Sequence, residues 1–88
     1  MVVTFDQNDI NEACRTFDIE TRDYYIECRP GLVYMHWIAT VDELKAMVQR
    51  KQQCVDICIK DKWVDLSTID EINMPERLTA CRYILAVN

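Results

Sequence analysis

Glycine, serine and histidine are nearly absent from this chain of 88 residues, in which each occurs once, as Gly31, Ser67 and His36. A single glycine excludes a glycine-rich phosphate-binding loop, which needs several glycines so that the backbone can approach the phosphates. The lone serine follows Leu66 and precedes Thr68, so it does not sit between the glycines of a nucleophile elbow. Two common kinds of active site are therefore ruled out.

Long apolar runs are also missing. No segment approaches the 18 or so apolar residues of a membrane helix, and residues 1–6 lack the basic region and apolar core of a secretion signal. We therefore expect a cytoplasmic protein. Its five cysteines are then expected to be reduced and to act as small core residues, not as a disulfide framework.

Candidate metal and thiol sites are weak. Cys54 and Cys58 fall in an alternating segment that predicts a strand, where they would lie about 13 Å apart. Zinc–sulfur bonds of about 2.3 Å cannot span that distance. An enzyme that pairs His36 with Cys28 or Cys58 is an alternative, but the predicted pairing keeps His36 away from Cys28. We expect no catalytic residues, no metal and no cofactor.

The centre of the chain predicts a β-hairpin. Residues 23–28 alternate between two faces, and residues 32–39 are apolar on both faces, as in an interior strand. Pro30 favours the second position of a turn, and Gly31 supplies the positive φ that follows it. A turn centred on Pro30 predicts that Tyr24 pairs with His36, although a slip of one residue would exchange every face.

The remaining pattern predicts a strand, helix, strand, strand, helix, strand order. The first strand is residues 2–5, and an apolar stripe at Ile10, Ala13, Cys14 and Phe17 predicts a helix that opens near Asp9 and Glu12. Thr40 and Glu43 form a capping box for the second helix. Residues 54–60 form the last strand of this core, and a short strand over 63–66 follows.

This order is that of the split βαβ, or ferredoxin-like, two-layer α+β sandwich. We expect one domain over residues 1–88, with its core in about 1–60 and a C-terminal extension in about 61–88. The pattern over 75–87 fits a helix or a strand, and the strand is favoured because Tyr83, Ile84 and Leu85 prefer sheets. Since the third strand is apolar on both faces, something should cover its outer face: the C-terminal segment, a second copy or a partner.

Charge is unevenly distributed. The net charge is −5, and residues 1–28 hold seven acidic and two basic residues. An acidic chain repels phosphate backbones, so nucleic acid is an unfavourable partner. The acidic first helix suits a basic protein surface, including that of a nucleic-acid-binding protein, although acids on a helix are also ordinary as a solvated face.

We therefore predict a small acidic, non-catalytic regulatory protein that binds another protein, of the kind that viruses or mobile elements encode to inhibit a host factor. One alternative is a homodimeric structural or assembly subunit that pairs through the apolar strand. A second is an RNA-binding module of the split βαβ fold, although residues 31–38 lack the basic residue and aromatic spacing of such modules. The candidate partner-binding residues are Asp9, Glu12, Asp18, Glu20, Tyr34, His36, Trp37 and Trp63.

Overall fold

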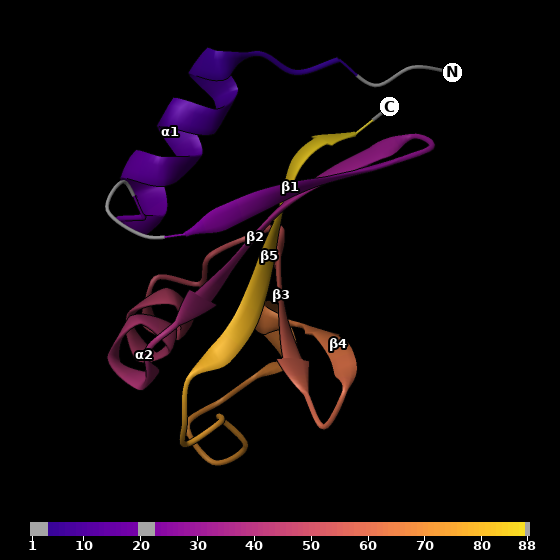
Figure 1. The fold of residues 1–88 in the computed structure, drawn as a ribbon. Helices are drawn as coiled ribbons and strands as arrows, with labels where there is room; N and C mark the ends of the chain where they lie inside the picture. Colours follow the sequence, from indigo (N-terminus) through magenta and orange to yellow (C-terminus); the bar gives the residue numbers. More distant parts are fainter. Residues whose placement is uncertain (1–3, 20–22, 88) are drawn as a thin grey trace. The chain divides into compact units, whose positions relative to one another are not determined.

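A computed structural model describes residues 4–19 and 23–87 of the chain. Within these residues the fold is α+β, with two α-helices and a five-stranded antiparallel sheet in the order β1-β2-β5-β3-β4 (Figure 1). The chain divides into two compact units, residues 1–37 with 83–88 and residues 38–82. The elements are α1 (Gln7–Phe17), β1 (Tyr24–Arg29), β2 (Leu32–Ala39), α2 (Val41–Gln49), β3 (Val55–Ile59), β4 (Lys62–Asp65), the 3₁₀ helix η1 (Leu66–Thr68) and β5 (Thr79–Val87).

The expected ferredoxin-like strand order is not confirmed, although the α+β class is compatible with a two-layer fold. Of the expected first strand, Thr4 and Phe5 belong to no strand, and residues 2 and 3 lie outside the described part of the chain. The position between β2 and β3 is taken by β5, which has nine residues. A strand of that length forms far more ladder hydrogen bonds than a segment of four residues, which explains why the C-terminal segment is central.

The β1–β2 hairpin has the predicted turn but a different register. Gly31 has φ 79°, as the turn prediction requires. Tyr24 pairs with Trp37 and Tyr25 with His36, so the expected pairing of Tyr24 with His36 was wrong by one residue. The physical reason is that the loop contains only two residues, because Arg29 and Leu32 are already paired.

Helix α1 begins earlier than the sequence pattern indicated. Asp6, and not Asp9, is the N-cap: its side chain accepts a hydrogen bond from the Asp9 backbone N–H, and the Asp9 side chain accepts one from the Asp6 backbone N–H. This reciprocal pair satisfies two of the backbone donors that a helix leaves without partners at its start. The expected pairing of Asp9 with Glu12 is therefore corrected.

Aromatic side chains form the core of the unit that contains α1. The Phe17 ring lies 4.7 Å from that of Trp37 on β2 and 5.0 Å from that of Tyr83 on β5, measured between centroids. The stripe that the sequence predicted is buried, and its members are Ile10, Ala13, Cys14 and Phe17. Burial of this stripe holds α1 against the sheet, and Figure 1 shows the C-terminal end of the helix near the start of β1.

The other unit follows the sequence pattern closely. Helix α2 begins with the predicted capping box, in which the Thr40 hydroxyl accepts from the Glu43 backbone N–H. The β3–β4 hairpin turns through Lys60 and Asp61, which both have positive φ.

The favoured strand over the C-terminal segment is confirmed as β5, and its Cys81 is fully buried. No helix in the described part of the chain is long and apolar enough to cross a membrane.

Candidate functional site

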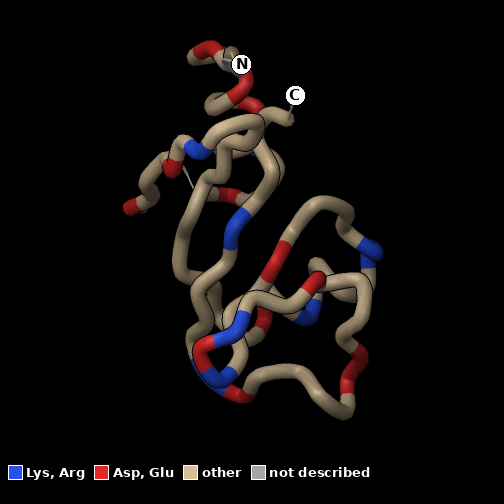
Figure 2. The backbone as a smooth tube through the Cα atoms, turned by 90° about the vertical axis from the view of Figure 1, so that its right-hand side faces the viewer, with Lys and Arg blue, Asp and Glu red and all other residues tan. Residues whose placement is uncertain are grey.

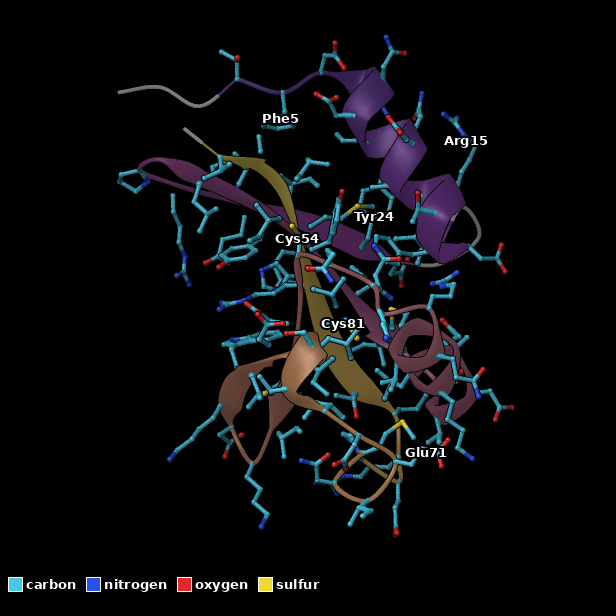
Figure 3. All side chains as sticks on the ribbon, turned by 180° about the vertical axis from the view of Figure 1, so that it is seen from behind. Phe5, Arg15, Tyr24, Cys54, Glu71 and Cys81 are labelled. Carbon is cyan, nitrogen blue, oxygen red and sulfur yellow. The ribbon has the colours of Figure 1, made fainter. Side chains whose placement is uncertain are left out.

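The exposed face of α1 carries the acidic residues that the sequence singled out. Asp9 and Glu12 are exposed on successive turns of the helix, and Asp18 is exposed at its C-cap with φ 54°. Glu20, the fourth acidic candidate, lies outside the described residues. Figure 2 shows the acidic positions along this N-terminal part of the chain, and Figure 3 shows Arg15 extending from the same helix. The exposed residues of α1 therefore include two acids and one base among neutral polar side chains, and Asp18 adds a third acid at the C-cap.

A small hollow lies beside this acidic face, and we call it the α1 groove. It encloses about 130 Å³ and is lined by Asp9, Glu12, Ala13, Thr16, Tyr83 and Leu85. The four α1 residues follow a helical spacing of three and four, which places them on one face. Because Phe17 packs against Tyr83, the aromatic wall of the groove is fixed by the core of the same unit.

The two carboxylates of the α1 groove have different roles. That of Asp9 accepts the Asp6 backbone N–H at 3.1 Å and so belongs to the helix cap. The Glu12 side chain has no hydrogen-bond or ion-pair partner within residues 4–19 and 23–87.

A second group of polar side chains lies on the β1–β2 hairpin, and we call it the His36 cluster. It comprises Tyr25, Glu27, Arg29, Tyr34 and His36. The His36 Nε2 atom lies 2.8 Å from Glu27 Oε1, and Arg29 Nε donates to Glu27 Oε2 at 2.9 Å. The Tyr25 ring stacks on the His36 ring at 4.4 Å between centroids, with 5° between their planes.

The His36 cluster is a hydrogen-bonded network around Glu27, which forms an ion pair with Arg29 and a hydrogen bond with His36. The hydrogen bond with His36 and, next, that from Arg29 hold the pKa of the Glu27 carboxyl below its usual range. Cys28 neighbours Glu27 on the strand, so its side chain points to the opposite face of β1. The geometry therefore does not form a thiol–imidazole pair between Cys28 and His36.

Sequence reasoning selected Tyr34 and His36 from this cluster but missed Tyr25, Glu27 and Arg29. The assumed register paired the wrong faces of β1 and β2, which placed Tyr25 and Glu27 away from His36. The available signal was the Pro30–Gly31 pair, since a loop of only these two residues produces the observed register.

The aromatic candidates differ in accessibility. Tyr34, His36 and Trp37 are all buried, so both faces of β2 are already covered at these positions. Trp63, in the other unit, is partly exposed, and the Arg82 guanidinium lies 4.4 Å from its ring centroid. Arg82 also donates to Asp56 at 2.9 Å. The structure thus keeps Trp63 accessible but places it in a different unit from Asp9 and Glu12.

The described residues include no group of three or more histidine, cysteine, aspartate or glutamate side chains placed to hold a metal ion. With this geometry in view, comparisons with protein-family models, with curated proteins and with solved structures find no significant match to the chain. A functional interpretation therefore depends on the α1 groove, the His36 cluster and the surfaces around them.

Proposed function

We propose that this protein is a small non-catalytic regulatory or inhibitory protein that binds another protein through the α1 groove and the acidic face around it. The observation that carries the proposal is the position of the Glu12 carboxylate, exposed and without a partner in the described chain, at the rim of a hollow with an aromatic wall. The His36 cluster is a poorer candidate, because its carboxylate already binds two side chains.

The size of the groove favours one side chain of a partner over a small molecule. Sites for small molecules usually enclose about 300–1,000 Å³, and the α1 groove encloses about 130 Å³. An arginine matches its chemistry, since the guanidinium pairs with Glu12 while the aliphatic part lies along Leu85 and Tyr83. A basic protein surface is thus the proposed partner, and occupying a nucleic-acid-binding surface would exclude its nucleic acid.

The test is affinity capture from nuclease-treated cell extract, with proteins quantified by mass spectrometry. Glu12→Arg reverses the charge at the groove, and Asp42→Asn, which removes the charge of an exposed acid at the start of α2, is the control. We expect specific proteins to be captured by the wild type and by Asp42→Asn but not by Glu12→Arg. Titration of the purified partner should then show at least tenfold weaker binding to Glu12→Arg. Equal retention by all three forms would contradict the proposal.

A further inference from the structure

Strand β1 lies at one end of the sheet, so within residues 4–19 and 23–87 no strand pairs with its outer edge. Such an edge presents backbone N–H and C=O groups that can pair with another chain. The opposite edge, β4, has four residues and begins with Lys62, a residue that discourages pairing. β1 has six residues with neither lysine nor proline, and its two charged side chains, Glu27 and Arg29, bind each other. Of the two edges, β1 is therefore better suited to strand addition.

The hairpin turn determines which residues of β1 direct their backbone groups outward. Arg29 and Leu32 are paired across a loop of two residues, and in such a turn the carbonyl of the first residue accepts from the N–H of the fourth. From this pair onward, the backbone groups of an antiparallel strand alternate between facing its neighbour and facing away. The outward backbone groups therefore belong to Tyr24, Ile26 and Cys28.

We propose that the outer edge of β1 pairs with the same edge of a second copy of this chain. The two strands are antiparallel, and the two-fold axis passes beside Ile26, so that each Ile26 exchanges backbone hydrogen bonds with Ile26 of the other copy. Tyr24 then pairs with Cys28 of the other copy, which covers two accessible side chains, since Tyr24 is 39% exposed and Cys28 is exposed.

The charges along β1 select this register. A two-fold axis normal to the sheet keeps equivalent faces together, so it can pass beside Tyr25, Ile26 or Glu27. An axis beside Glu27 would place two carboxylates opposite each other, and an axis beside Tyr25 would place Asp23 opposite Glu27. Like charges in directly opposite positions destabilise a sheet. With the axis beside Ile26, Asp23 instead lies opposite Arg29, twice in the dimer, and Glu27 lies opposite the uncharged Tyr25.

Both members of the new charge pair can take part in it. Asp23 directly precedes β1, is exposed, and has no hydrogen-bond or ion-pair partner in the described part of the chain. Arg29 donates to Glu27 from Nε, so its Nη atoms remain for a second carboxylate. Because the two copies use the same surface, association stops at a dimer. This dimer goes beyond the proposed function, since it uses no residue of the α1 groove.

Sedimentation velocity over a wide concentration range tests the dimer. We expect the wild type to shift from monomer to dimer as concentration rises. Cys28→Pro removes an outward N–H without removing a hydrogen bond of the hairpin, and it should raise the dissociation constant at least tenfold. Cys28→Ala keeps that N–H and is the matched control, which should dimerise like the wild type. A wild type that is monomeric at every concentration, or a Cys28→Pro variant that dimerises normally, overturns the proposal.

A cross-link tests the register and does not depend on how well the proline variant folds. In the proposed dimer, Tyr24→Cys places a thiol opposite the native Cys28 of the other copy, at a Cα separation of about 5.5 Å that a disulfide can span. Within one chain these positions are about 13 Å apart. Mild oxidation should therefore link two copies through positions 24 and 28, as peptide mapping by mass spectrometry would show. Tyr25→Cys, on the opposite face of β1, is the control, and equal linkage of both variants to Cys28 would contradict the register.

Discussion

At the scale of single residues, Glu27 shows how one carboxylate organises the β1–β2 hairpin. Its two oxygens bind different side chains: Oε1 pairs with His36, which is buried, and Oε2 pairs with Arg29, which is partly exposed. The charged form of Glu27 is therefore favoured in the folded protein, and its contribution to folding depends on pH.

We predict that Glu27→Gln makes the free energy of unfolding less dependent on pH in the acidic range. The pKa of Glu27 is lower in the folded protein than its usual value of 4.5, so its stabilising effect is complete above that value and is lost as pH falls through the folded pKa. The free energy of unfolding measured with urea should therefore fall more between pH 7 and pH 3 for the wild type than for the variant. Glu71→Gln, which removes an exposed charge, should keep the wild-type profile.

The cysteines give a second prediction at this scale. Burial, with a smaller effect from Glu43, raises the pKa of the Cys81 thiol to about 12, whereas Cys28 and Cys54 are exposed. A maleimide should therefore label Cys28 and Cys54 first at neutral pH, and Cys81 only after unfolding. Peptide mapping by mass spectrometry measures this order. Early labelling of Cys81 in the folded protein would show that β5 is not buried there.

The raised pKa of the Cys81 thiol also makes the stability of the folded protein depend on pH in the alkaline range. Because the pKa of Cys81 is higher in the folded protein than in the unfolded chain, the protonated thiol stabilises the folded state fully below about pH 9, the ordinary pKa of a cysteine thiol. This stabilisation is lost as pH rises toward 12.

At the scale of elements, sequence patterns identified the helices and strands but located their ends less well. The Thr40 and Glu43 pair is a standard capping box, and the start of α2 was predicted correctly. Helix α1 instead uses aspartate at both positions, Asp6 and Asp9, so a search for glutamate at the third position placed its start too late. The wrong pairing of Tyr24 with His36 has a similar local origin, since β2 is apolar on both faces and its pattern does not select one register.

The β1–β2 turn supports a prediction about backbone conformation. Gly31 has φ 79°, and a Cβ atom added there would meet no other atom within 4 Å. The cost of Gly31→Ala is therefore conformational, and we expect it to destabilise folding by about 1–2 kcal/mol. Gly31→Asn should cost less, because asparagine tolerates positive φ better than alanine does. Chemical denaturation of the two variants measures the difference, and equal stability of Gly31→Ala and wild type would contradict this account.

At the scale of the whole molecule, the strand order was the feature that the sequence could not specify. Every local signal for β5 was present in Cys81, Tyr83 and Leu85, yet its place between β2 and β3 depends on contacts between residues far apart in the chain. Local periodicity contains no information on such pairing. The α1 groove shares this origin, because Tyr83 and Leu85 come from the opposite end of the sequence to Asp9 and Glu12.

The position of β5 predicts that the C-terminal segment is essential for folding. A chain that ends at Leu78 lacks the strand between β2 and β3, so each of these strands loses a neighbour, and the unit with α1 loses Tyr83 from its aromatic core. We expect this shortened chain to show no cooperative urea transition by circular dichroism. A chain that ends at Ala86 is the control, since it loses the exposed Val87 and the terminal residue but keeps the buried part of β5. A cooperative transition in the chain that ends at Leu78 would mean that residues 1–78 suffice for folding and that β5 is an addition to a complete core.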